Sequence, residues 1–151
     1  MPTAASSLTV RKILPCRPEV AFEAWTKPAV FRKWFAPMPG MKVTAKFDLR
    51  RGGKYRIGFK PEDKPMMYVG GKFVVIDPPH RIEYTWVWEE KSNPDWKGCV
   101  SLVTVLFNAI ESERTEIVLT HERFADPDEC KSHTKGWTKI LNRMAAALRG
   151  K

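Results

Sequence analysis

Apolar and polar side chains alternate in successive segments between residues 43 and 121, and this pattern constrains the fold more than any other feature. A period of two residues places the apolar side chains of a strand on one face. Turn sequences such as Gly52-Gly53 and Asp77-Pro78-Pro79-His80 separate the segments. Strands that are apolar on one face only are typical of an antiparallel sheet with one covered face. We expect strands at residues 8–14, 43–50, 54–59, 67–76, 81–89, 100–107 and 115–121.

An amphipathic helix expected at residues 127–148 supplies the cover for that face. Asp126 suits the N-cap, and Pro127 suits the first helical position, where its missing N–H would have no partner. At about 100° per residue, one stripe of the helix is apolar and consists of Cys130, His133, Trp137, Ile140, Leu141, Met144 and Leu148. The opposite stripe is basic and consists of Lys131, Lys135, Lys139 and Arg143. Packing the apolar stripe on the sheet buries both apolar surfaces.

The N-terminal part of the chain is expected to form one strand followed by two short helices. In the strand, a change of phase between Val10 and Ile13 predicts a β-bulge. Pro18 and Pro28 each open a short helix at a position where a missing N–H costs nothing. A length of 151 residues suits one domain. We therefore predict a single α+β domain over residues 1–151, with a curved antiparallel sheet wrapped around a long C-terminal helix.

Cysteine usage and hydropathy indicate the compartment. Cys16, Cys99 and Cys130 lie far apart and are odd in number, which argues against a disulfide framework and fits a reducing cytosol. No stretch approaches the roughly 18–20 apolar residues that a membrane span requires. Residues 1–7 are polar and lack the apolar region of a signal peptide. We expect a cytoplasmic protein without a membrane span.

The net charge of +9 suggests an anionic partner. Residues 42–72 hold nine basic and three acidic side chains, and residues 131–151 hold six basic and no acidic ones. The basic stripe of the helix lies opposite its apolar stripe, where a solvated face is expected. The stripe also lacks the interleaved aromatic residues of proteins that bind single-stranded nucleic acid. We therefore do not expect nucleic-acid binding.

Five segments in order resemble the family named for similarity to the activator of heat-shock protein 90 ATPase, within the START-like (SRPBCC) superfamily. They are residues 20–28, Trp34-Phe35, residues 48–55, residues 77–82, and His133 with Gly136-Trp137 and Leu141. The resemblance covers roughly residues 8–148 and implies the helix-grip fold. It also implies a cavity between sheet and C-terminal helix, which the superfamily uses for lipids, polyketides, hormones and aromatic compounds. Some relatives resemble cyclases or hydrolases, and the eukaryotic namesake binds a chaperone.

The concave face of the sheet and the C-terminal helix supply the candidate ligand-binding residues. The hydroxyls of Tyr55 and Tyr84 are candidates for orienting a ligand. His121 and His133 are candidate acid–base groups. Two imidazoles are two ligands short of a closed zinc site, so no metal site is expected. The full set of candidate ligand-binding residues is Trp34, Tyr55, Phe59, Tyr84, Trp86, Trp88, His121, His133 and Trp137.

The same residues also suit a filled core in which each histidine is hydrogen-bonded for structural reasons. Gly136, in the middle of the helix, is expected to serve close packing rather than to leave room for a ligand. The leading hypothesis is a domain that binds a small apolar or aromatic molecule, lipid-like or polyketide-like, in a cavity of at least about 300 Å³. The alternatives are a cyclase- or hydrolase-type enzyme that uses the same cavity, and an interaction module that contacts a chaperone or forms a homodimer.

Sequence motifs of several enzyme classes are missing. The chain contains no GxSxG, Walker, GxGxxG or HExxH motif. Gly52-Gly53 and Gly70-Gly71 lie in a turn and a strand, and neither pair opens a helix. No residue is therefore assigned a catalytic role, and no cofactor is expected.

Overall fold

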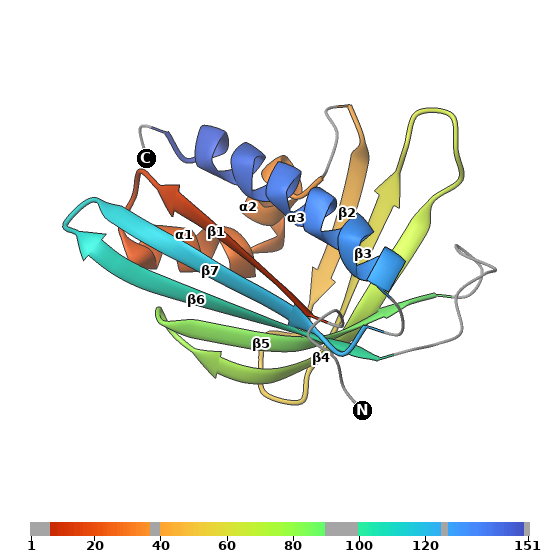
Figure 1. Cartoon of the computed structure of the whole chain (residues 1–151), viewed down its shortest axis with the longest axis horizontal. Coiled ribbons are helices and arrows are strands. Elements are labelled where there is room, and N and C mark those ends of the chain that lie inside the picture. The colour runs from red at the N-terminus through yellow and green to blue at the C-terminus, as the bar shows by residue number, and fades with distance from the viewer. Residues whose placement is uncertain (1–6, 37–39, 90–99, 125–126, 150–151) are drawn as a thin grey trace.

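The computed structural model describes residues 7–36, 40–89, 100–124 and 127–149. Figure 1 shows the order of the strands and helices within them. The helices are α1 (Pro18–Thr26), α2 (Pro28–Trp34) and α3 (Pro127–Ala147). The strands are β1 (Ser7–Leu14), β2 (Lys42–Phe47), β3 (Lys54–Lys60), β4 (Met67–Asp77), β5 (Arg81–Trp88), β6 (Ser101–Glu111) and β7 (Arg114–Glu122).

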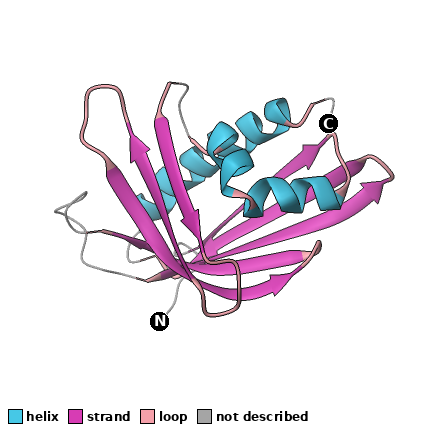
Figure 2. Cartoon of the chain, turned by 180° about the vertical axis from the view of Figure 1, so that it is seen from behind, coloured by secondary structure: helices cyan, strands magenta, loops and turns pink. Residues whose placement is uncertain are grey.

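The strands form one antiparallel sheet in the order β1-β7-β6-β5-β4-β3-β2. From β2 to β7 each strand pairs with its neighbour in the chain, and β1 pairs with β7. Figure 2 shows that the sheet curves around the helices, all of which lie on its concave side. This arrangement confirms the predicted α+β fold, with a C-terminal helix held by a curved sheet and two short helices after the first strand.

Helix starts and buried faces follow the sequence signals. Pro18 and Pro28 occupy the first turns of α1 and α2, and α3 begins at Pro127. The predicted N-cap, Asp126, lies outside the described residues, as does Cys99. None of the helices in the described ranges is long and apolar enough to cross a membrane. The buried side chains of α3 are those of the predicted apolar stripe: Cys130, Trp137, Ile140, Leu141 and Met144.

Aromatic side chains from α1 and α2 fill one end of the concave face. Phe31 stacks on Phe35 with ring centroids 4.1 Å apart. Trp25 meets Phe107 of β6 at 6.1 Å, and its indole N–H donates to the hydroxyl oxygen of Tyr84 at 3.3 Å. Edge-to-face and offset contacts of this kind add to the free energy gained by burial. This end of the sheet is therefore solid core.

The bulge predicted in the first strand is wrong. β1 pairs with β7 residue by residue without a register shift. Its regular alternation directs Ile13 to the outer face, where the residue is 44% exposed. Exposing one isoleucine costs less than leaving ladder N–H and C=O groups unpaired. Register shifts occur instead between Phe73 and Val75 of β4 and between Ala109 and Glu111 of β6.

Candidate functional site

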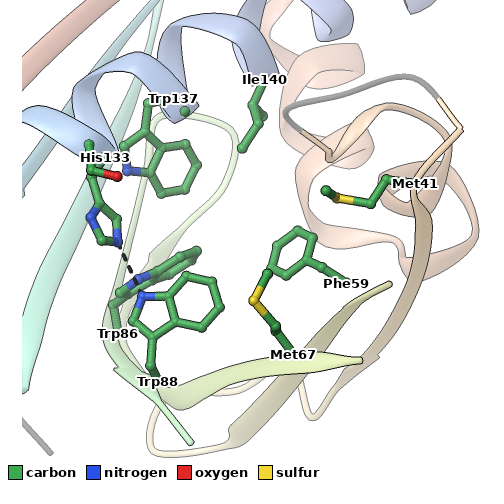
Figure 3. Close-up of a pocket in the computed structure, with 10 residues that line it drawn as sticks. Met41, Phe59, Met67, Trp86, Trp88, His133, Trp137 and Ile140 are labelled. Carbon is green, nitrogen blue, oxygen red and sulfur yellow. Dashed lines mark hydrogen bonds between the residues drawn. The ribbon is translucent and has the colours of Figure 1, made fainter. Parts of the chain in front are cut away.

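A pocket of about 190 Å³ lies between α3 and the adjoining strands of the sheet. Figure 3 shows Trp137 and Ile140 of α3 on one side of it and Phe59 and Met67 of the sheet on the other. Its walls are mainly aromatic rings, thioethers and one imidazole, which suits an apolar guest. The lining residues are Met41, Phe59, Met67, Trp86, Trp88, Ser132, His133, Gly136, Trp137 and Ile140.

Two periodicities bring these residues together. On α3, Ser132, Gly136 and Ile140 are four residues apart and therefore lie on one face of the helix. On β5, Trp86 and Trp88 are two residues apart and project to the same side of the sheet. One face of the helix and one face of the strand, each set by its own side-chain period, thus meet at this pocket.

Gly136 lines the pocket and is not part of a tight packing contact. A Cβ atom built on it would meet no atom within 4 Å, apart from its chain neighbours and the backbone of its own helix. The expectation that close packing requires this glycine is therefore wrong. Glycine in a helix costs roughly 1 kcal/mol relative to alanine. At this position the missing side chain leaves open space in the pocket wall.

Replacing Gly136 with alanine is expected to raise the free energy of unfolding by about 1 kcal/mol, because helix propensity improves and no atom is displaced. Urea unfolding monitored by circular dichroism measures the change. Lys135→Gly, at the exposed position next to it, is the matched control and is expected to lower stability by roughly 0.7 kcal/mol. A less stable Gly136→Ala protein would show that the space is not open.

The indole N–H of Trp88 donates to Nε2 of His133 across 3.2 Å, drawn as a dashed line in Figure 3. Nδ1 of the same imidazole lies 2.9 Å from the carbonyl oxygen of Glu129. An indole N–H can only donate, so Nε2 must be the acceptor. Nδ1 therefore carries the hydrogen and donates to the Glu129 carbonyl. These bonds fix the neutral tautomer of His133 and tie α3 to β5.

His121 is fully buried behind Trp137. The indole N–H of Trp137 donates to Nδ1 of His121 at 3.0 Å, so Nε2 carries the hydrogen. Nε2 then donates to the hydroxyl of Ser101 at 2.7 Å, and that hydroxyl donates to the carbonyl of Trp86 at 3.1 Å. His121 and His133 therefore occupy opposite tautomers, and both nitrogens of each ring are engaged.

Burial keeps both imidazoles neutral. Desolvation, assisted by the nearby His133, lowers the pKa of His121 from 6.5 to about 2. Desolvation also lowers the pKa of His133, against a smaller opposite effect of its bond to the Glu129 carbonyl. Protonation would in addition set a new N–H against an indole donor in each case. Neither histidine has a free nitrogen with which to take a proton from a guest, so the arrangement does not favour acid–base chemistry.

The structure brings together part of the predicted ligand-binding set. His121 lies behind Trp137 and supports it. Trp34 lies in the core, where its indole N–H donates to the Ala24 carbonyl at 3.2 Å. The predicted residues that line the pocket are Phe59, Trp86, Trp88, His133 and Trp137.

Tyr55 and Tyr84 do not line this pocket, so they are not placed to orient a guest in it. The Tyr55 hydroxyl donates to the backbone carbonyl of Thr85, and the Tyr84 hydroxyl accepts the indole N–H of Trp25. Burial raises the pKa of both phenols. Their hydroxyls serve the internal hydrogen bonding of the filled end.

The pocket is smaller than the predicted 300 Å³ because side chains of α1 and α2 fill the other end of the concave face. A separate space beside Tyr55 and Tyr84 measures only about 10 Å³, about the size of one water molecule. Sequence reasoning missed Met41, Ser132 and Ile140 as lining residues. Ser132 and Ile140 had a usable signal, because each lies four residues from Gly136 on the helix.

Within residues 7–36, 40–89, 100–124 and 127–149, no three side chains of His, Cys, Asp or Glu gather as a metal site. The ring centroids of His121 and His133 are 5.2 Å apart, and their nitrogens are occupied by the hydrogen bonds described above.

The curved sheet, the gripped helix and the pocket between them define a helix-grip protein of the START-like kind. The family model described as activator of Hsp90 ATPase homolog 1-like protein matches residues 15–149. The chain belongs to this family. No curated protein sequence matches the chain.

Solved structures share the fold over nearly the whole chain. A protein from Chromobacterium violaceum superposes with a TM-score of 0.82 at 20% identity, covering 97% of this chain and 99% of that one. A family member from Silicibacter pomeroyi gives 0.80 at 24% identity, covering 95% and 97%. An Hsp90 activator from Plasmodium falciparum gives 0.72 at 24% identity, covering 95% and 96%. At these identities the likeness shows the fold alone.

Proposed function

We propose that this domain binds a small apolar or aromatic molecule in the pocket between α3 and the sheet. The observation that carries the proposal is the open space at Gly136, in a wall otherwise built of aromatic and thioether side chains. Close-packed interiors leave few voids larger than a water molecule. A well-packed domain that keeps about 190 Å³ free beside a helix glycine has room for a guest.

The volume limits the size of the guest. An apolar cavity of about 150 Å³ holds one benzene molecule, so about 190 Å³ suits a compound of one or two rings. A long lipid or a polyketide of many rings would require the pocket to expand. The proposed guest is therefore at the small end of the ligands expected from the sequence.

The hydrogen bonds that engage His121 and His133 favour ligand binding over catalytic turnover. Each imidazole would have to give up an indole hydrogen bond before it could act as a base. Trp137 and Trp88 are instead held in fixed orientations by those bonds, as the walls of a preformed binding site require. The hypothesis of an enzyme that uses His121 or His133 in this pocket is therefore less favoured.

Filling the pocket tests the proposal. In Gly136→Leu the new side chain enters the open space, and we expect the affinity for 1-fluoronaphthalene to fall at least about tenfold while the fold is kept. Binding is followed by fluorine NMR. Asn142→Leu, which adds the same side chain at an exposed position of α3 outside the pocket, should bind as the wild type does.

Two results would contradict the proposal. One is equal affinity in Gly136→Leu and the wild type, which would place the probe elsewhere. The other is a wild type that binds neither 1-fluoronaphthalene nor fluorobenzene and whose native mass spectrum contains no co-purified molecule.

A further inference from the structure

A second hollow lies on the outer face of the sheet, opposite the side that carries α3. It measures about 650 Å³ and is open to solvent across β2, β3, β4 and β5. Gly70 of β4, which has no side chain, and Val87 of β5 both line it. We call it the outer groove. Its lining residues are Lys46, Phe47, Asp48, Lys54, Tyr55, Arg56, Gly70, Gly71, Lys72, Val87 and Glu89.

Strand register sets cations against cations around the outer groove. Lys54 lies directly opposite Lys72, and Lys46 lies directly opposite Arg56. Just beyond the groove, Lys42 is paired with Lys60 in the same way. All six side chains are exposed. Like charges directly opposite each other destabilise a sheet, so these pairs carry an energetic cost.

The nearby carboxylates do not neutralise the lysines. Both oxygens of Glu89 accept hydrogen bonds from Arg56, at 2.7 and 2.9 Å. Asp48 accepts from Nε of Arg50 at 2.9 Å. In the described part of the chain, no ion pair involves Lys42, Lys46, Lys54, Lys60 or Lys72. The outer groove therefore presents a positive field to solvent.

The side chains around the outer groove identify the chemistry of a partner. Lysine offers a point charge on a flexible stem, whereas arginine is the residue suited to bidentate phosphate contacts. The groove's single arginine, Arg56, is already held by Glu89 and covers the ring of Tyr68, with Cζ 3.7 Å from the ring centroid. Arg56 thus occupies one face of the Tyr68 ring, and that face is not available for the base stacking typical of single-stranded nucleic-acid binding.

We propose that the outer groove docks an acidic polypeptide segment, whose carboxylates would relieve the repulsion between the facing lysines. The segment lies across β2, β3 and β4, on the opposite side of the sheet from the pocket. Guest binding and docking are therefore separate functions of the two faces. The basic stripe of α3 has similar charge, but none of Lys131, Lys135 and Lys139 lines a described pocket.

Matched charge removal tests the docking proposal. The probe is a fluorescein-labelled peptide rich in aspartate and glutamate, measured by fluorescence anisotropy at several salt concentrations. Lys46→Gln/Lys54→Gln/Lys72→Gln should weaken binding about tenfold, since each exposed ion pair contributes about 0.2–1 kcal/mol. Lys131→Gln/Lys135→Gln/Lys139→Gln removes the same charge from α3 and should weaken binding by about twofold or less.

Folding and alternative partners are checked in the same experiment. The groove variant should melt at the same temperature as the wild type or higher, because it loses like-charge repulsion. Equal weakening in the two triple variants would overturn the proposal, since net charge alone would then explain binding. Tighter binding of an oligothymidylate than of the peptide, lost in the groove variant, would also overturn it by identifying a nucleic-acid site.

Discussion

Replacing Trp137 with alanine is expected to lower the free energy of unfolding by about 4 kcal/mol, the largest effect of any single substitution considered. The side chain is buried, stacks on Trp25 at 6.3 Å between ring centroids, and donates its N–H to His121. Alanine would leave a cavity and also an unpaired buried nitrogen on the imidazole. Urea unfolding gives the value directly.

A more conservative change separates the two contributions. Trp137→Phe keeps an aromatic ring but removes the N–H, and should cost about 2 kcal/mol because Nδ1 of His121 loses its donor. Trp88→Phe is the matched control, since it removes the same kind of bond to His133 at a half-buried site where water can substitute. If Trp137→Phe cost no more than Trp88→Phe, the buried bond to His121 would have no special role.

Mild acid is expected to destabilise the domain through His121. The folded state holds the pKa of this imidazole at about 2, against 6.5 for an ordinary histidine. Below pH 6.5 the unfolded chain therefore binds a proton that the folded protein excludes, so stability falls as the pH falls. Between pH 7 and pH 5 the loss should be about 2 kcal/mol, at roughly 1.4 kcal/mol per pH unit below 6.5. His133, whose pKa is also lowered, acts in the same direction.

His121→Gln is the informative variant for this pH dependence. It should be less stable than the wild type at pH 7, because the bond to Trp137 or to Ser101 is lost. Its stability should nevertheless change little between pH 7 and pH 5 beyond the share of His133. Unfolding curves at matched pH values measure both slopes. Identical slopes in the wild type and His121→Gln would assign the acid sensitivity to other groups.

Most of the fold was predictable from local pattern. Alternation at Tyr55, Ile57 and Phe59 placed β3, and helical spacing from Trp137 to Met144 gave the buried face of α3. Both signals depend on residues close together in the chain, and they do not require knowledge of the tertiary structure. The β-bulge assigned to β1 failed because an outward Ile13 looked like a change of phase when it was simply exposed.

The concave face is divided into a filled aromatic end and an open pocket, and the sequence did not predict which inward-facing residues belong to which. Tyr55 of β3 and Tyr84 and Trp86 of β5 all project inward, yet only Trp86 among them lines the pocket. What separates them is the position of α1, which brings Trp25 onto Tyr84 across 59 residues of chain. Periodicity shows that a side chain faces inward, but it does not show whether another element covers that side chain. Gly136 was misjudged for the same reason.

Because the solid core and the open pocket occupy different ends of one concave face, substitutions in the pocket need not endanger the fold. Met41 and Met67 are half-buried at the pocket, and hydrophobic exchanges of similar volume usually cost less than about 1.5 kcal/mol. Trp25 and Phe31, at the other end, are almost completely buried among rings and have no such freedom. Substitutions that reshape the pocket are therefore expected to leave the packing of the aromatic end, and the stability that depends on it, largely unchanged.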